Sequence, residues 1–306
     1  MKEVEMIKTS KKNKIKKSPY DIAFIIVNTI ILTIFCIVTL YPIINTLAIS
    51  FNEAVDTLTG GIRLLPRKWT VQNYRTVLNM RTLMRGAYVS VLRTVIGTVS
   101  QTFVTAMLAY VLSRKEFYFN RQVSLIYVIT MYVNAGIIPT LLLYQRLGLT
   151  NTFWVYIIPG MVSAFNMIVI RTYMNGLPDS FVESAQVDGA GHVRIFLQII
   201  LPLCKPVLAT VALFVAVGHW NSWFDAMIYN AQREDMTTLQ YELMKLLSAV
   251  SQQSGDPNAV KHASSMVTPE SVRAAATMVT ALPIVCLYPF LQRYFVTGLT
   301  IGGVKE

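Results

Sequence analysis

Six stretches of the sequence are mostly apolar and contain no Asp, Glu, Lys or Arg. They cover residues 22–52, 94–113, 122–145, 147–170, 206–224 and 274–292. A helix needs about 18 or more such residues to cross a bilayer, and each stretch is long enough. The pattern therefore predicts an all-α fold, an integral membrane bundle of six transmembrane helices. We place the spans at about 21–49, 86–112, 122–144, 152–174, 204–227 and 274–295.

The polar segments divide the chain around this six-span domain, which covers 21–296. A basic tail (1–20) precedes the domain and a short tail (297–306) follows it. Two long outer loops are expected, at 50–85 and 228–272. Amphipathic character from Trp69 to Leu83 predicts a helix resting on the outer interface in the first loop. The second loop is rich in Ser, Gln and Asn, and without an obvious fold it is either disordered or a binding loop.

Prolines and amides interrupt the third and fourth spans. Pro139 and Pro159 predict kinks, which membranes tolerate when neighbouring helices satisfy the freed carbonyl groups. Asn134 and Asn166 lie at mid-depth in these spans. Two interpretations stay open for the asparagines: hydrogen bonds between helices, or the lining of a solute path.

The loop at 178–206, between the fourth and fifth spans, is a stretch punctuated by polar residues in an otherwise apolar C-terminal half. Ser180 and Glu183 have the spacing of a capping box, which predicts that a short helix begins there. Asp188 and Gly189 end this helix, because glycine tolerates the left-handed conformation of a helix end.

A second helix is predicted directly after the glycine bend. Four apolar residues recur at i, i+3, i+4 and i+7 and would share one face: Val193, Phe196, Leu197 and Ile200. Pro202 and Pro206 are expected to stop this helix. The loop therefore presents a short helix and a bend, a shape suited to insertion into a partner's socket.

Composition supports the membrane assignment. Apolar residues make up 54% of the chain and charged residues 14%, well below the roughly 25% of soluble domains. The net charge of +11 does not indicate nucleic-acid binding, because the excess lies in the N-terminal tail and in short loops. The Lys-rich tail predicts a cytoplasmic N-terminus, and six spans then predict a cytoplasmic C-terminus. The six cations of 50–85 conflict with this topology, which we keep because the first span usually dominates.

Arg93 is an ionisable residue within the second span. Such residues are candidates for functional sites. The alternative is a structural one, in which the side chain reaches the interface or bonds to a neighbouring helix, and we favour it.

The fifth span ends in a polar and aromatic segment around His219, Trp220, Asn221 and Trp223. The two tryptophans are typical of an interfacial belt. The competing interpretation is a vestibule crossed by a sugar, in which Asn134 and Asn166 also line the path.

The sequence carries no signature of catalysis or of a bound cofactor. There is no Gly-Lys pair, so no phosphate-binding P-loop is expected. The three histidines are far apart, which predicts neither a metal site nor a catalytic triad. The three cysteines lie in or beside predicted spans and are interpreted as small buried hydrophobic residues: Cys36, Cys204 and Cys286.

The 178–206 loop resembles the EAA loop of permease subunits of binding-protein-dependent ABC importers. The resemblance rests on Glu183-Ser184-Ala185, Asp188-Gly189-Ala190, Phe196, Ile199, Leu201-Pro202-Leu203 and Pro206. Ser184 departs from the usual Ala but is also small. The C-terminal QRYFVTGLTIGGVKE resembles the end of the smaller permease in the maltose-type, carbohydrate-uptake branch, and the resemblance covers nearly the whole chain.

This resemblance implies a bacterial inner-membrane protein that is not itself an enzyme. A second, homologous permease would complete the path, two copies of an ABC ATPase would dock below, and an extracytoplasmic solute-binding protein would deliver a carbohydrate, an oligosaccharide. The residues implied in coupling are Glu183, Ser184, Ala185, Asp188, Gly189 and Ala190. Those implied in a tail at the ATPase interface are Gly298, Gly302, Gly303 and Lys305.

The sequence leaves three alternatives to this function. The first is an ABC permease for a different polar solute. The second is an ion-coupled secondary transporter, which would need carboxylates or histidine chains inside its spans. The third is a membrane enzyme, for which the chain has no nucleophile motif. Co-purification of a second permease and an ATPase would separate the ABC importer from the other two classes.

Overall fold

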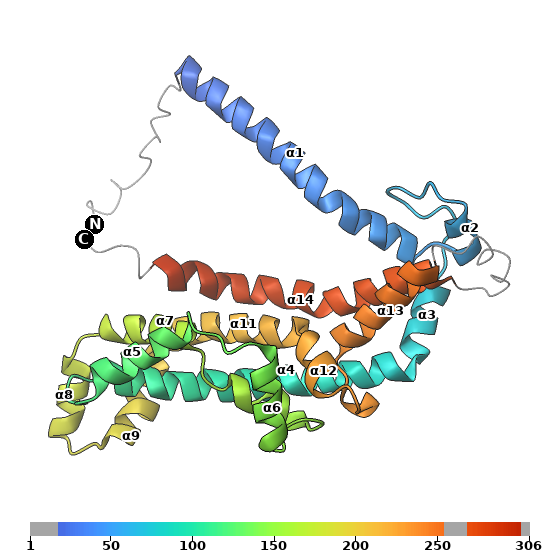
Figure 1. The fold of residues 1–306 in the computed structure, drawn as a ribbon. Coiled ribbons are helices and arrows are strands. Elements are labelled where there is room, and N and C mark those ends of the chain that lie inside the picture. The colour runs from blue at the N-terminus through green and yellow to red at the C-terminus, as the bar shows by residue number, and fades with distance from the viewer. Residues whose placement is uncertain (1–17, 254–267, 301–306) are drawn as a thin grey trace, which may run out of the picture.

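The computed structural model describes residues 18–253 and 268–300, and these residues form helices joined by turns (Figure 1). The first half contains α1 (Pro19–Ser50), α2 (Ala54–Leu58), α3 (Gln72–Asn79), α4 (Arg81–Ser113), α5 (Asn120–Thr130), α6 (Ile137–Arg146), two 3₁₀ turns (Phe153–Tyr156, Ile158–Gly160) and α7 (Ala164–Asn175). The second half contains α8 (Ser180–Val187), α9 (His192–Ile195), a π-helical turn (Phe196–Ile200), α10 (Leu201–Leu203), α11 (Lys205–Asn221), α12 (Phe224–Tyr229), a 3₁₀ turn (Glu234–Met236), α13 (Leu239–Gln253) and α14 (Pro269–Thr300).

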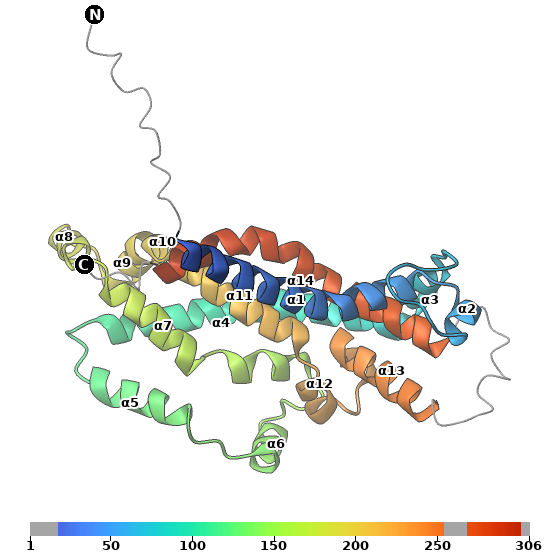
Figure 2. The ribbon, with the colours of Figure 1, turned by 90° about the horizontal axis from the view of Figure 1, so that it is seen from above.

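The helices form an elongated bundle around α4. Helix α4 packs against α11 and α7, and α14 lies beside α11. Helices α8 and α9 lie at one end of the bundle, which we call the α8 end, and α2 and α3 lie at the other, the α3 end (Figures 1 and 2). Helix α1 contacts α14 and diverges from the bundle toward the α8 end (Figure 1).

Two of the described helices, α1 and α4, are long and apolar enough to cross a membrane alone. The count rises to four if two bent pairs each form one span. These pairs are Phe153–Gly160 with Ala164–Asn175, bent by 46°, and His192–Leu203 with Lys205–Asn221, bent by 82°. The bend beside Pro159 fits the predicted kink. The number of six spans stays a prediction.

The third predicted span is not one helix. It is divided into α5 and α6 by an irregular segment at 131–136. Gly136 has a φ of +87°, which a helix cannot contain, and the Asn134 side chain accepts a hydrogen bond from the Gly136 amide at 2.9 Å. The interruption therefore precedes Pro139, which lies inside α6. An Asx-type bond to the backbone, rather than the proline, marks the break.

The main apolar core lies where α4, α7 and α11 meet the α8–α10 segment. It contains Ala106, Ala109 and Leu112 of α4, Met167, Ile170 and Met174 of α7, and Ile195, Phe196, Ile200 and Val211. Small residues on α4 allow close helix approach, as expected inside a membrane where apolar burial alone does not drive helices together. This core fixes the α8 end to the spans.

Several predicted boundaries change. The predicted loop 228–272 contains the 15-residue helix α13, which packs on α4 and α14. Residues 297–300, assigned to the C-terminal tail, belong to α14, and α1 begins at Pro19 inside the predicted N-terminal tail. Cys204 is buried as predicted, but Cys36 and Cys286 are exposed, because each lies on a helix surface that this chain does not cover.

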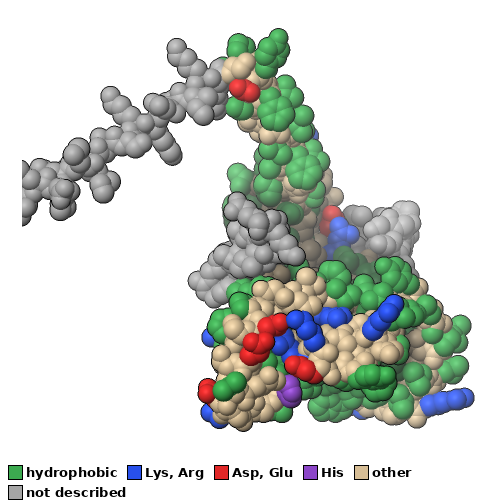
Figure 3. Space-filling model, turned by 90° about the vertical axis from the view of Figure 1, so that its left-hand side faces the viewer, with side chains coloured by type: hydrophobic (Ala, Val, Ile, Leu, Met, Phe, Trp, Pro, Cys, Tyr) green, Lys and Arg blue, Asp and Glu red, His purple; other side chains and the backbone are tan. Residues whose placement is uncertain are grey.

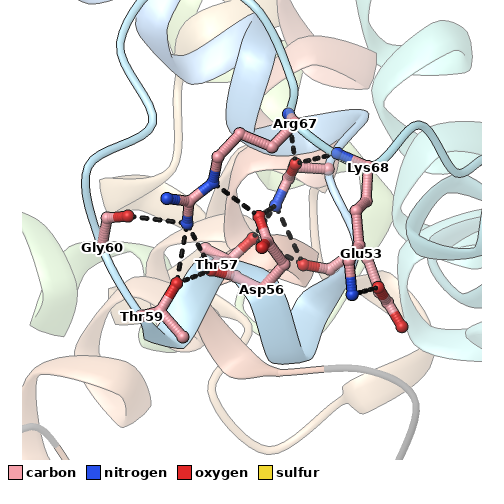
Figure 4. A network of polar contacts seen from close by, with 8 residues as sticks. Glu53, Asp56, Thr57, Thr59, Gly60, Arg67 and Lys68 are labelled. Carbon is pink, nitrogen blue, oxygen red and sulfur yellow. Dashed lines mark hydrogen bonds and ion pairs between the residues drawn. The ribbon is translucent and has the colours of Figure 1, made fainter.

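Polar contacts hold the predicted loop 50–85 together at the α3 end (Figure 4). The Arg67 guanidinium donates to the Asp56 carboxylate at 2.9 Å and to the Gly60 carbonyl at 2.8 Å. Lys68 pairs with Glu53 at 3.1 Å. The hydrogen bond from Asn52, followed by the contacts of Arg67, lowers the pKa of Asp56. The predicted helix at 69–83 is present as α3 and the first residues of α4.

Candidate functional site

A cavity of about 290 Å³ lies between α4, α7 and α11 in the half of the bundle toward the α3 end. Its wall combines charged, amide and hydroxyl groups with apolar carbons. The lining residues are Arg93, Gln101, Asn166, Phe214, Val215, Gly218, His219 and Ser222. The space is a groove that is open on one side, and polar groups that converge between the helices of a bundle make it a candidate solute site.

Arg93 joins four elements at this cavity. Its side chain is 4% exposed and forms a bidentate ion pair with Asp225 of α12, with Nη1 donating to Oδ1 at 3.0 Å and Nη2 donating to Oδ2. Its Nε donates to Nδ1 of His219 on α11 at 3.3 Å. The guanidinium lies 4.5 Å from the centre of the Tyr156 ring. The bond to a neighbouring helix that we favoured from the sequence is therefore present, and Arg93 also lines the cavity.

Asp225 has its own set of donors. Ser222 Oγ and the Ala226 amide each donate to Oδ1 at 2.9 Å, in addition to the arginine. The Asp225 side chain is 22% exposed and that of Arg93 only 4%, so the ion pair is buried on its arginine side and partly exposed on its aspartate side. Asp225 lies in the first turn of α12, and its carboxylate ties this short helix to α4 and to the end of α11.

Gly97 makes room for the His219 ring. An added Cβ at Gly97 would lie 2.4 Å from Nε2 and 2.7 Å from Cε1 of His219, closer than real contacts allow. The hydrogen bond from Arg93 to Nδ1 places the proton of a neutral imidazole on Nε2. The glycine therefore allows α4 and α11 to approach with the imidazole between them.

Asn166 is the best-buried amide of the cavity wall, with 7% exposure. It lies in the first turn of α7, where its backbone amide donates to Ser163 Oγ at 3.3 Å. Within the described residues, neither the Asn166 nor the Gln101 side chain has a hydrogen-bond partner. A buried polar group without a partner in the protein is suited to bonding a solute or water.

The structure brings together only part of the predicted path. Asn166 and His219 line the cavity, whereas Asn134 lies outside it, at the break between α5 and α6. Trp220 faces α14, because its Nε1 donates to the Thr280 carbonyl at 3.0 Å, and it is too buried for an interfacial belt. Asn221 is exposed and accepts a bond from Gln240.

Trp223 lies at the start of α12, edge-on to the Phe224 ring at 5.7 Å, and does not line the cavity. Sequence reasoning missed Gln101 and Ser222. Gln101 lies two helical turns from Arg93 on α4, and this i, i+8 spacing was the available signal.

At the α8 end, the predicted short helix is present as α8. It begins one residue earlier than a Ser180 cap requires, with Asp179 as N-cap, and the predicted capping box does not form. Gly189 has a φ of +78°, and the Ala190 amide donates to the Ala185 carbonyl at 2.9 Å, which closes the helix end as predicted. Ala185 is buried against the core, whereas the side chains of Glu183, Ser184 and Asp188 are exposed.

The helix after the bend differs from its predicted form. Residues 196–200 form a π-helical turn, which shifts the apolar face by adding a residue to the turn. Ile195, Phe196 and Ile200 are buried, whereas Val193 is 74% exposed and Leu197 44%. Pro202 does not stop the helix, because it lies inside α10, and the chain bends at Cys204 instead.

Charged side chains of both signs gather on the face of the α8 end (Figure 3). Lys115 donates to Asp179 at 2.9 Å, and this bond raises the pKa of Lys115 and lowers the pKa of Asp179. A second cavity of about 340 Å³ is lined here by Tyr110, Val111, Arg114, Glu116, Phe117 and His192. The Tyr110 hydroxyl lies 3.3 Å from Nδ1 of His192, linking α4 to α9.

Gly298 lies in the last turn of α14. The other residues implied in an ATPase-interface tail, Gly302, Gly303 and Lys305, lie outside the described residues, as do residues 1–17 and 254–267. Among the described residues, no group of three or more His, Cys, Asp or Glu side chains could hold a metal ion.

Comparison with known proteins identifies the family. Residues 101–301, about two thirds of the chain, match the family described as binding-protein-dependent transport system inner membrane component. This chain belongs to that family. It is therefore a membrane permease subunit of an ABC transporter, a class without enzymatic activity of its own. Permeases of this class work with a partner permease, an ATPase and a binding protein.

Curated relatives cover most of the permease. It is 32% identical over 275 residues to the polygalacturonan/rhamnogalacturonan transport system permease protein YtcP of Bacillus subtilis, covering 90% of this chain and 95% of the relative. It is 34% identical over 270 residues to the protein LplC of the same organism, covering 88% and 90%.

The fold also matches a solved structure. The chain aligns with a chain of a bacterial ABC transporter involved in the import of the acidic polysaccharide alginate, with a TM-score of 0.84 and 32% identity. The alignment covers 91% of this permease and 99% of that chain. The all-α architecture is thus that of an ABC permease.

Proposed function

We propose that this permease pairs with a second, homologous permease to form the translocation path for a carbohydrate, an oligosaccharide. The observation that carries the proposal is the cavity between α4, α7 and α11, where unpartnered amides face the interior of a membrane bundle. Sugars present many hydroxyl groups, which pair with amides and hydroxyls. Relatives of 26–32% identity are named as permeases for polygalacturonan/rhamnogalacturonan, arabinooligosaccharides and galactooligosaccharides.

Coupling to an ATPase is assigned to the EAA loop at 178–206. Helix α8 exposes Glu183, Ser184 and Asp188 on one side and packs Ala185 into the core on the other. A body that docks on the exposed side would therefore transmit its movement to α4, α7 and α11 through the buried side. Two copies of the ATPase would dock below the two permeases, and Gly298 and the following tail would approach their interface.

This assignment sets the orientation. The α8 end and both termini face the cytoplasm, the α3 end faces the extracytoplasmic binding protein, and six spans connect the two sides. The lysine-rich N-terminal tail supports this orientation. Helices α5 with α6, and the bent pairs at 153–175 and 192–221, then act as spans three to five.

Substitution at Gly189 tests the coupling. Gly189→Trp in the assembled importer, reconstituted in proteoliposomes, should abolish the stimulation of ATP hydrolysis by loaded binding protein. Gly148→Trp is the matched control, because Gly148 also has a positive φ, +66°, and open space around it, but lies in the turn after α6. Full stimulation in Gly189→Trp would refute the docking of α8.

Substitution at Asn166 tests the path. Asn166→Leu replaces a buried amide with an apolar side chain of similar size. The variant should lower sugar uptake several-fold while ATP hydrolysis without substrate continues. Asn134→Leu is the control, since this asparagine lies outside the cavity. Equal uptake in the two variants would remove the cavity from the path.

A further inference from the structure

Four threonines follow one face of α4. Thr94, Thr98, Thr102 and Thr105 recur at i, i+4, i+8 and i+11, which places their side chains in one row along the helix. We call this row the threonine stripe. Six buried side-chain atoms lack a hydrogen-bond partner within the described part of the chain, and three of them are the hydroxyl oxygens of Thr94, Thr98 and Thr102. The unpaired groups are therefore concentrated on one helix face.

The threonines of α1 show how a membrane helix satisfies this side chain by itself. The hydroxyls of Thr29 and Thr33 each donate to the backbone carbonyl four residues earlier at 2.7 Å, and that of Thr46 does so at 2.8 Å. Ser100 of α4 forms the same bond at 2.7 Å. This bond within the helix is open to any helical threonine. Because the first three residues of the stripe do not form it, their hydroxyls are available to a partner outside α4.

These three hydroxyls do not join α4 to its neighbours in this structure. Polar side chains that join membrane helices form hydrogen bonds across the interface, and Thr105 at the end of the stripe forms one, from its hydroxyl to the Met161 carbonyl at 3.3 Å. The other three have no such bond, and burying a hydroxyl without a partner costs free energy. An arrangement of the helices that gives these hydroxyls partners would remove the cost.

The threonine stripe borders the cavity between α4, α7 and α11. Each of its first three residues directly follows a residue on the cavity side of α4. Of these residues, Arg93 and Gln101 line the cavity, and Gly97 makes room for the His219 ring. Successive residues of a helix are about 100° apart around its axis, so the stripe lies on the flank next to the cavity wall. A rotation of α4 by part of a turn would bring the hydroxyls into the cavity.

The helices packed on α4 contain bends that would allow such a movement. A bend of 46° separates η2 from α7, close to the Met161 carbonyl that Thr105 binds, and a bend of 82° separates α10 from α11. Shifts and rotations of packed helices are a common way for a protein to switch between two states. Helices α7 and α11 are also the two that make the most extensive contact with α4. A change at either bend would therefore alter how α4 is covered.

We propose that Thr94, Thr98 and Thr102 line the translocation path in a second state of the importer, in which their hydroxyls hydrogen-bond to the hydroxyl groups of the sugar. The structure shows the state in which the stripe is covered. The inference rests on the proposed function and adds residues to the path. The three hydroxyls are spaced about 6 Å apart along the axis, so they offer successive contacts to a sugar that moves along α4.

Valine substitution tests the role of the hydroxyl. Thr98→Val keeps the branched shape and removes the hydroxyl. In the purified importer complex without nucleotide, this variant should raise the unfolding temperature by about 2–4 °C, because the covered state no longer buries an unpaired hydroxyl. In proteoliposomes it should lower sugar uptake several-fold, because the second state loses a contact. Thr98→Ser keeps the hydroxyl and should retain uptake.

Thr33→Val on α1 is the matched control, since the hydroxyl of Thr33 already bonds within its own helix. We expect uptake by this variant to stay at the wild-type level. A lower unfolding temperature in Thr98→Val would show that the hydroxyl holds helices together and would overturn the proposal. Unchanged uptake in the triple variant Thr94→Val/Thr98→Val/Thr102→Val would overturn it as well, because transport would then not use the stripe.

Cysteine labelling tests the second state directly. Thr98→Cys is introduced into the complete importer after Cys36, Cys204 and Cys286 of this chain have been replaced by alanine. A water-soluble thiosulfonate then labels the permease in the nucleotide-free importer and in the importer trapped by ATP and vanadate with loaded binding protein. We expect the labelling rates in the two states to differ by about tenfold or more, since a minor state commonly holds about a tenth of the population or less before a ligand shifts it.

Val99→Cys is the control for labelling, because Val99 is the next residue on α4 and its side chain is 67% exposed at the surface. Its labelling should be the same in both states. Equal labelling of Thr98→Cys in the two states, whether fast or absent, would overturn the second state. Failure of the stripe leaves the difference between Asn166→Leu and Asn134→Leu intact, whereas failure of the proposed function removes that difference. The two hypotheses are therefore refuted by different results.

Discussion

Gly97→Ala should destabilise the permease, although replacing a glycine inside a helix with alanine normally stabilises it. The gain from helix propensity is about 1 kcal/mol. Against it stands a clash, because the added Cβ would lie 2.4 Å from Nε2, 2.7 Å from Cε1 and 2.8 Å from Cδ2 of His219. The atoms belong to a rigid ring, so no flexible end can bend away.

The His219 ring has two ways to respond, and both cost free energy. If the ring stays, the overpacking costs about 1–3 kcal/mol. If the ring moves, its hydrogen bond with Arg93 at 3.3 Å breaks, and a bond to a charged group is worth about 1.5–3 kcal/mol. After the gain from propensity of about 1 kcal/mol is subtracted, the net loss is about 0–2 kcal/mol if the ring stays and about 0.5–2 kcal/mol if the ring moves.

Thermal unfolding of the purified importer complex measures this effect, with Gly218→Ala as the matched control. Gly218 is one residue from His219, and an added Cβ there meets nothing within 4 Å. We expect Gly97→Ala to lower the unfolding temperature and Gly218→Ala to raise it slightly or leave it unchanged. Equal stabilisation by the two substitutions would refute the packing of His219 against α4.

A double variant checks the cause. His219→Ala removes the ring, so Gly97→Ala added to it should no longer destabilise, and the two effects should be strongly non-additive. Additive losses would mean that Gly97 is needed for something other than the ring.

Three further predictions concern polar contacts toward the α3 end. Ser90→Ala should lower the free energy of unfolding by about 1–3 kcal/mol, because Ser90 Oγ accepts a hydrogen bond from the buried Leu239 amide at 2.9 Å and no other acceptor replaces it. Thermal unfolding measures the loss. Ser100→Ala is the control, because it removes only a hydrogen bond within α4. Arg67→Ala should make the segment 58–66 several-fold more sensitive to proteases added to sealed right-side-out vesicles, since four hydrogen bonds of its guanidinium are lost; unchanged cleavage would show that the backbone alone orders the loop. Because the pKa of Asp56 is lowered, its contribution to stability is present above pH 3.8, the ordinary pKa, and is lost as the pH falls through the lowered pKa. Asp56→Asn should therefore make the unfolding temperature depend less on pH below about pH 4 and change it little at neutral pH.

The sequence predicted the features that follow from local rules. The helix at 21–49 appears as α1 because an uninterrupted apolar run has no other structure in a membrane. Gly189 ends α8 with a positive φ because its position after Asp188 is a standard helix end. Arg93 was recognisable from its charge in a span.

Other features depend on contacts between distant residues and could not be read from local pattern. Trp220 faces α14 because Thr280, 60 residues away, accepts its Nε1 proton. The π-helical turn at 196–200 shifts the buried face from the regular period, so Val193 and Leu197 are exposed. Residues 239–253 were predicted as loop because their Ser and Gln residues obscure the apolar face. In the structure they form α13, whose apolar face packs on α4 and α14.

The 82° bend at Cys204 gives the segment from α9 to α11 the shape of an L with two rigid arms. The shorter arm, His192–Leu203, has 12 residues and is about 18 Å long. The longer arm, α11, has 17 residues and is about 25 Å long. The corner is stiff, because Cys204 is fully buried and its backbone amide and carbonyl continue the hydrogen bonds across the bend. If the N-terminal tip of the shorter arm moves by about 1 Å along the axis of α11, the far end of α11, where His219 lies, would therefore move sideways by about 1.4 Å. If an ATPase docks on α8 as proposed, a small push along the bundle axis there would become a larger sideways displacement near His219.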